Sequence, residues 1–123
     1  DKEITLADIP GLIEGAHKGI GLGTKFLKHI ERCKTLLHMI DITDKNLEKS
    51  YNQIKKELAN YSKELASKKE IIVLNKIDLL EKKIVEKIKK KFSKNKKSEV
   101  ITLSTLEKKS VTNIKAKLLS YVY

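Results

Sequence analysis

The chain has 123 residues, 40% of them hydrophobic, and this length and composition suit one folded domain and exclude wholesale disorder. No apolar run approaches the ~20 residues of a membrane helix, and the single cysteine excludes an internal disulfide and favours a reducing, cytoplasmic setting. The formal net charge of +11 allows attraction to a polyanion such as RNA, but lysines that only keep helix faces in solvent explain it as well. Arg32 is the only arginine, which disfavours specific reading of base edges. We expect a monomer without a membrane span.

The N-terminal stretch predicts a strand that breaks abruptly. Residues 4–7 are apolar or small and are followed by Asp8. Pro10 lacks a backbone donor and Gly11 favours turn geometry, so the strand cannot continue. An open α/β sheet binds its ligands where a carboxylate ends a strand and a glycine turn follows. Asp8 is therefore a candidate ligand-binding residue.

The following segment predicts a helix and then a strand. A helical pattern starts at Thr24, and we interpret Cys33 as a small apolar residue on that helix. Residues 35–40 form a nearly continuous apolar run that ends at Asp41, which is typical of a strand buried on both faces of a parallel sheet. We expect His38, inside this run, to be a hydrogen-bonded core residue and not a metal ligand.

A long amphipathic helix is predicted next, with Thr43 or Asp44 as its N-cap and its end near residue 67. Its apolar positions alternate steps of four and three residues: Leu47, Tyr51, Ile54, Leu58, Tyr61 and Leu65.

Two further pairs of strand and helix complete the pattern. Residues 70–74 and 100–103 read as strands, and each precedes a helical apolar pattern, the last of which ends near residue 122. The lysine-dense residues 87–97 are interpreted as a solvated helix end and loop, with an RNA-facing patch as the alternative. Strands that alternate with helices predict an α/β fold, a mainly parallel sheet with flanking helices.

Polar clusters follow three of the predicted strands. They are Asp8-x-x-Gly11, Asn75-Lys76-x-Asp78 and Ser104-Thr105. The carboxyl ends of parallel strands lie along one edge of the sheet, so three segments that are remote in the sequence should meet at one ligand crevice.

The segment of residues 75–78 has the chemistry of a guanine site. A carboxylate accepts two hydrogen bonds side by side, and guanine presents adjacent N1–H and N2–H donors that adenine lacks. Asp78 can accept both, Asn75 can donate to the other edge of the base, and Lys76 can lay its methylene stem over the ring. The alternative is an ordinary turn rich in Asn and Asp after a strand.

These motifs resemble those of P-loop GTPases. Asp8-Ile9-Pro10-Gly11 is similar to their third conserved box, Asn75-Lys76-Ile77-Asp78 to the fourth, and Ser104-Thr105-Leu106 to a weakened fifth, with Thr105 in place of the usual alanine. More narrowly, the chain resembles the Obg family of ribosome-associated GTPases. That resemblance rests on Asp8 to Ala16, Gly19-Ile-Gly-Leu-Gly23, Phe26-Leu27, His29-Ile-Glu-Arg32 and the Leu36-Leu37-His38 to Asp41 strand. It is strong from Leu6 to Leu80 and thins over the lysine-rich end.

The resemblance implies that residues 1–123 are part of a Ras-like G domain of the Obg type, from the Asp-x-x-Gly box to the last helix. The implied residues for GTP or GDP are Asp8, Ile9, Pro10, Gly11, Asn75, Lys76, Ile77, Asp78, Ser104, Thr105 and Leu106. Asp8 would also hold Mg²⁺ through a water, and glycines 19, 21 and 23 would be hinges of the second switch. Leu12 occupies the position of the usual water-orienting glutamine, so no catalytic residue is assigned and intrinsic hydrolysis should be slow.

The sequence contains no Gly-x₄-Gly-Lys-[Ser/Thr] phosphate loop, because no two of its five glycines are five positions apart. We therefore expect the 123 residues to be the later part of a G domain that hydrolyses GTP only as a whole, with an implied role in assembly of the large ribosomal subunit. Two alternatives stay open: a basic, noncatalytic module that binds RNA or the ribosome, and an inactive truncated remnant.

Overall fold

The computed structural model describes residues 32–122. The elements in this part of the chain are β1 (Thr35–Asp41), α2 (Leu47–Tyr61), α3 (Lys63–Ser67), β2 (Lys69–Asn75), η2 (Ile77–Leu79, one 3₁₀ turn), α4 (Lys82–Ser93), β3 (Glu99–Leu103) and α5 (Lys108–Val122). The strand predicted over residues 4–7, the turn that follows it and the start of the helix predicted from Thr24 lie outside the described residues. No helix between residues 32 and 122 is long and apolar enough to cross a membrane.

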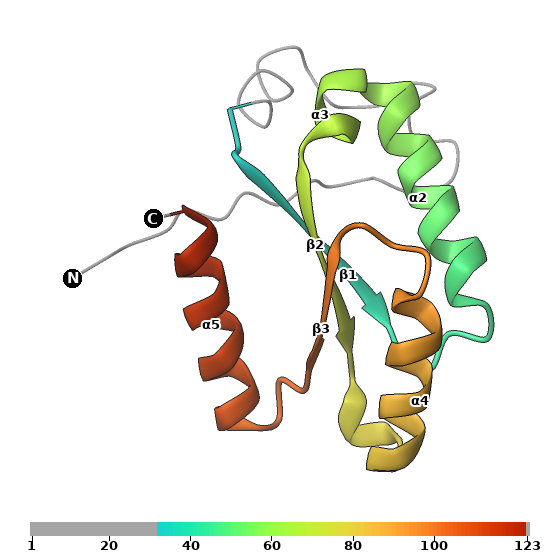
Figure 1. The fold of residues 1–123 in the computed structure, drawn as a ribbon, viewed down its shortest axis with the longest axis vertical. Coiled ribbons are helices and arrows are strands. Elements are labelled where there is room, and N and C mark those ends of the chain that lie inside the picture. Colours follow the sequence, from blue (N-terminus) through green and yellow to red (C-terminus); the bar gives the residue numbers. More distant parts are fainter. Residues whose placement is uncertain (1–31, 123) are drawn as a thin grey trace.

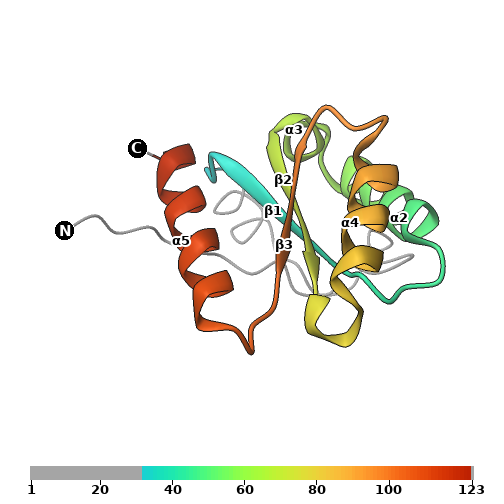
Figure 2. The ribbon, with the colours of Figure 1, turned by 60° about the horizontal axis from the view of Figure 1, so that its bottom comes forward.

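The three strands form one parallel sheet in the order β1-β2-β3 (Figure 1). Helices α2 and α4 connect consecutive strands and lie on one side of the sheet, whereas α5 lies on the other side (Figure 2). The predicted α/β class and parallel sheet are thus confirmed for this part of the chain. Because all three strands point the same way, their carboxyl ends share one edge.

Strand β2 is the centre of the core. Ile71, Ile72, Val73 and Leu74 are all fully buried, because helices cover both faces of this strand. The face toward α2 and α4 buries Ile40, Ile42, Tyr51, Ile72, Leu74, Val85, Phe92 and Val100, and the face toward α5 buries Ile71, Val73, Leu103 and Ile114. A continuous apolar run, not an alternating one, is what such a two-sided burial requires.

The helix that was predicted to run to residue 67 has a different N-cap and is interrupted. Asn46 is the N-cap, and its side chain accepts a hydrogen bond from the N–H of Lys49. Asp44 instead accepts hydrogen bonds from the Asn46 N–H and the Ser50 hydroxyl, which keeps it ahead of the helix. Ser62 is extended, ends α2 and caps α3 by accepting from the Leu65 N–H, so the chain forms two helices.

Two other side chains lie in environments that differ from those predicted. Cys33 is not on a helix but in the irregular segment before β1, where its carbonyl accepts a hydrogen bond from Lys68. Lys96, within the stretch interpreted as solvated, has a largely buried side chain: its ammonium lies over the Phe92 ring, 4.2 Å from the centroid, and pairs with Glu48 at 2.7 Å. The face of the aromatic ring attracts the ammonium, and the carboxylate balances its charge.

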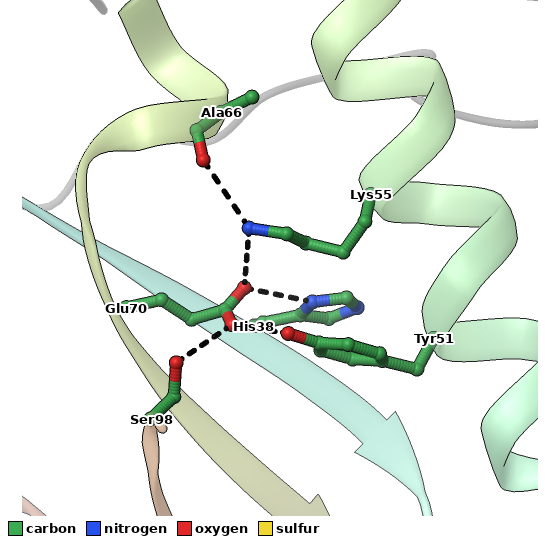
Figure 3. Close-up of polar contacts among 6 residues, drawn as sticks. All are labelled: His38, Tyr51, Lys55, Ala66, Glu70 and Ser98. Atoms are coloured by element: carbon green, nitrogen blue, oxygen red, sulfur yellow. Dashed lines mark hydrogen bonds and ion pairs between the residues drawn. The ribbon is translucent and has the colours of Figure 1, made fainter. Parts of the chain in front are cut away.

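A buried carboxylate on β2 ties together β1, α2 and Ser98, the residue before β3 (Figure 3). Oε1 of Glu70 accepts from the Tyr51 hydroxyl at 2.6 Å and from the Ser98 hydroxyl at 3.0 Å. Oε2 faces Nδ1 of His38 at 3.4 Å and the ammonium of Lys55 at 3.5 Å. Burial alone would raise the pKa of Glu70, but the four partners outweigh it and lower this pKa to about 2. The prediction that His38 is a hydrogen-bonded core residue is confirmed.

Candidate functional site

The carboxyl ends of the three strands form one row of residues. Asp41 pairs with Asn75, and Asn75 pairs with Leu103, after which Ser104 follows directly. The N–H of Ile42 donates to the carbonyl of Asn75 at 3.0 Å and so continues the ladder past β1. This edge of the sheet carries the two candidate segments that the structure describes, residues 75–78 and 104–106.

A tight turn follows β2 and aims the side chains of the first segment. Lys76 has φ 66° and ψ 34°, a left-handed conformation that is uncommon for a residue with a Cβ and costs about 1 kcal/mol or more. The side-chain oxygen of Asn75 accepts from the Lys76 N–H at 2.8 Å and supports this conformation. The chain then enters the 3₁₀ turn Ile77–Leu79, which carries Asp78 at the exposed edge, while Ile77 packs on the core. Strained turns of this kind cluster at binding sites.

Ser104 joins the two segments. Its hydroxyl donates to Oδ1 of Asp78 at 2.8 Å and lies 3.3 Å from the N–H of Leu106, from which it accepts. Ser104 is fully buried, and its own N–H donates to the Ser110 hydroxyl at 2.8 Å. The buried serine therefore fixes one oxygen of an exposed carboxylate, and within residues 32–122 the other oxygen, Oδ2, accepts no hydrogen bond.

The loop after β3 carries one backbone donor without an acceptor among the described residues. Thr105 and Leu106 are exposed, and Leu106 exposes 81% of its surface. No acceptor within residues 32–122 engages the N–H of Thr105. Thr105 directly follows Ser104, whose hydroxyl holds Asp78.

Asp41, which was predicted only to end a strand, belongs to this edge. Its Oδ2 lies 2.9 Å from the ammonium of Lys76, and its Oδ1 accepts from the hydroxyl of Thr43 at 2.6 Å and from the Thr43 N–H at 2.9 Å. The hydrogen bond from the Thr43 hydroxyl, followed by that from Lys76, lowers the pKa of Asp41 to about 2. The rule that was applied to the other strand ends, a polar residue at a carboxyl end, would have found it.

The remaining predicted site residues, Asp8, Ile9, Pro10 and Gly11, lie outside the described residues, as do Leu12 and glycines 19, 21 and 23. Asp8, which was predicted as the Mg²⁺ residue, is among them. Between residues 32 and 122 no group of three or more His, Cys, Asp or Glu side chains is placed to hold a metal ion. The described edge presents the Asp78 carboxylate, which Ser104 holds, and the N–H of the neighbouring Thr105. This arrangement suits a ring with adjacent hydrogen-bonding groups.

The chain is similar to known GTPases over nearly its whole length. The profile of a family described as "50S ribosome-binding GTPase" matches residues 1–76. The chain is 72% identical over 122 residues to a protein named GTPase Obg from Pelagibacter ubique, a match that covers 99% of this chain and 37% of that protein. Proteins of the same name from Ehrlichia chaffeensis and Rickettsia massiliae are 51% and 50% identical over 100% and 93% of this chain, and 36% and 34% of their own lengths. The chain spans about a third of the length of the curated relatives that it matches.

Proposed function

Since this chain belongs to the Obg family of GTPases, we propose that the carboxyl ends of β2 and β3 bind the guanine base of GTP or GDP. The observation that carries the proposal is the hydrogen bond from buried Ser104 to exposed Asp78, which sets the carboxylate in place before any ligand arrives. Its oxygens then accept the N1–H and N2–H of guanine. Preorganised acceptors bind more tightly because no side chain has to be ordered on binding.

The other residues of the edge surround the base in this proposal. The N–H of Thr105, which has no acceptor within residues 32–122, donates to O6 of guanine, which adenine replaces with an amino group. The side-chain amide of Asn75 donates to the far edge of the base, since its oxygen is engaged by Lys76. The methylene stem of Lys76 covers one ring face. Ile77 and Leu106 complete the two loops.

The phosphates and Mg²⁺ are assigned to residues outside the described part of the chain. In this proposal Asp8 would hold Mg²⁺ through a water, the Gly11 amide would meet the γ-phosphate, and glycines 19, 21 and 23 would be hinges of the second switch. Mg²⁺ would neutralise charge on the transferred phosphoryl group. We propose that residues 1–123 contribute to one G domain, and that hydrolysis needs phosphate-binding residues that are not among them.

The proposal predicts an order of affinities among nucleoside diphosphates. Inosine lacks only the N2 amine of guanine, so IDP should bind the full-length protein about 10- to 100-fold more weakly than GDP. ADP lacks both donors and should bind at least ~1,000-fold more weakly, since a site built on paired hydrogen bonds is left unsatisfied. Calorimetric titration with the three ligands measures the order. Binding of ADP within tenfold of GDP would contradict the proposal.

We further propose that the protein acts on the large ribosomal subunit, in the cytoplasm, and contacts its RNA through α4. Support comes from the family description and from four exposed lysines, Lys83, Lys87, Lys90 and Lys94, spaced so that they form one stripe opposite the buried face of the helix. Within residues 32–122 none of the four pairs with a carboxylate. Unpaired cations in a row suit an RNA backbone.

The variant K87Q/K90Q tests the lysine stripe. Binding of the full-length protein to large ribosomal subunits should weaken about tenfold, and the dependence of log K on log salt should flatten by about 1.4, because two phosphate contacts are lost. The control K109Q/K115Q removes the same charge from exposed positions of α5, on the other side of the sheet. Equal losses in both variants would show that net charge, and not the α4 stripe, attracts the RNA.

A further inference from the structure

We propose that Asp41 is a positioning residue of the nucleotide site, and that it acts by holding the side chain of Lys76 across the carboxyl edge of the sheet. This inference rests on the proposed guanine site and adds to it a residue from a third strand. The occupant that Lys76 would cover is a purine nucleoside, whose flat ring fits an extended methylene stem.

The geometry gives Lys76 one defined position. Its backbone is fixed at the end of β2 by the left-handed turn, and its ammonium is fixed by Oδ2 of Asp41 at the end of β1, 2.9 Å away. Asp41 and Asn75 are paired in the sheet, so the lysine stem spans from one strand end to the neighbouring one. The stem therefore lies along the edge where the base is proposed to bind.

Asp41 is itself held in place. Two donors from Thr43, the N–H at 2.9 Å and the hydroxyl at 2.6 Å, fix Oδ1 and leave Oδ2 for Lys76. The side chains of Lys76 and Asp41 are 54% and 39% exposed. An ion pair this exposed contributes little to folding stability, so its effect should appear in ligand binding.

A long side chain that becomes ordered only when the ligand binds loses conformational entropy, and this loss weakens binding. Immobilising one flexible side chain lowers affinity by a factor of about 3 to 10. If Asp41 orders Lys76 beforehand, the change D41N should weaken GDP binding about fivefold and should leave the preference for guanine over xanthine unchanged, because Asp78 reads the base.

A double-mutant cycle in the full-length protein tests the inference. The change K76M keeps an unbranched apolar stem and removes the ammonium, so D41N should weaken GDP binding about fivefold when Lys76 is present and less than twofold in the K76M background. The control D44N changes an aspartate in the loop between β1 and α2, and this aspartate makes no contact with Lys76. It should alter affinity less than twofold.

The outcomes separate this inference from the proposed function. An equal loss on D41N in both backgrounds, no loss in either, or an equal loss on D44N would overturn the role of Asp41. If K76M binds GDP too weakly to measure, the D41N variant alone tests the inference. A change of more than twofold in the ratio of its affinities for GDP and XDP would contradict positioning through Lys76. Failure of D78N to shift the preference toward xanthine would instead overturn the guanine site itself.

Discussion

Replacement of Glu70 by glutamine should destabilise the sheet by about 3 kcal/mol. The buried carboxylate accepts hydrogen bonds from Tyr51, Ser98 and His38 and pairs with Lys55. An ionised carboxylate only accepts, whereas a glutamine amide presents two donors to partners that are themselves donors. Removing one side of a buried, hydrogen-bonded ion pair costs about 3–5 kcal/mol, and the partial exposure of Lys55 places this case near the lower limit. Hydrogen exchange of the β2 amides in the full-length protein measures the loss.

The control for Glu70 is Glu99, which also accepts from a tyrosine, Tyr121, and pairs with a lysine, Lys117, at 2.6 Å. Its side chain is 36% exposed, so E99Q should cost less than about 1 kcal/mol. Equal losses of stability in E70Q and E99Q would mean that the buried Glu70 carboxylate stabilises the protein no more than an exposed one.

Acid should remove the contribution of Glu70 in a defined range of pH. Its pKa is lowered in the folded state from 4.5 to about 2, so its stabilisation is complete above about pH 5 and is lost as the pH falls from about 4.5 toward 2. The difference in stability between wild type and E70Q should therefore be constant from pH 7 to 5 and should shrink at pH 3.5. A difference that grows on acidification would contradict the ionised, hydrogen-bonded state of this residue.

Strand β2 could be predicted from the sequence because burial on both faces demands an uninterrupted apolar run, as in residues 71–74. The expectation that residues 35–40 are likewise buried on both faces was wrong, because within β1 only Ile40 is buried and Met39 is 46% exposed. The break between α2 and α3 could not be predicted, since Ser62 is neither proline nor glycine, and the helix ends there with an extended backbone and a capping hydroxyl. Likewise, the sequence favoured Thr43 or Asp44 as the cap, whereas Asp44 accepts from the Asn46 N–H and the Ser50 hydroxyl and Asn46 caps the helix instead.

Long-range partners account for what the sequence did not predict. The partners of Glu70 come from four separate positions along the chain, and its place at the start of a strand indicated nothing about them. The environment of Lys96 depends on the rings of Tyr51 and Phe92, which its lysine-rich neighbours in the sequence do not reveal. In contrast, Asp78 and Ser104 were predicted to meet, because residues at the carboxyl ends of neighbouring parallel strands share an edge, and they are in contact. Their role in binding guanine stays a prediction.

The substitution D78N should reverse the base preference of the full-length protein. Xanthine keeps the N1–H of guanine but carries a carbonyl in place of the N2 amine. The asparagine amide can accept from N1–H and donate to that carbonyl, and its oxygen can still accept from Ser104. Beside the wild-type carboxylate, the same carbonyl faces an acceptor, so two acceptors are left opposed and unsatisfied. We expect D78N to lose about 2 kcal/mol or more of binding free energy for GDP and to gain a similar amount for XDP. Together the two changes correspond to roughly a thousandfold change in the relative affinity for the two ligands.

The control is again D44N, an exposed aspartate near the same edge that contacts neither Ser104 nor Lys76. It should leave the preference for guanine unchanged. A similar shift in D44N would assign the effect to general loss of negative charge.

The ratio of the dissociation constants of XDP and GDP, measured by calorimetry on wild type and D78N, tests the guanine site most directly. We expect a ratio above ~100 for the wild type and below ~1 for D78N, with the D78N protein folded as judged by unchanged hydrogen exchange in β2. A ratio that stays the same in folded D78N would show that Asp78 does not read the base.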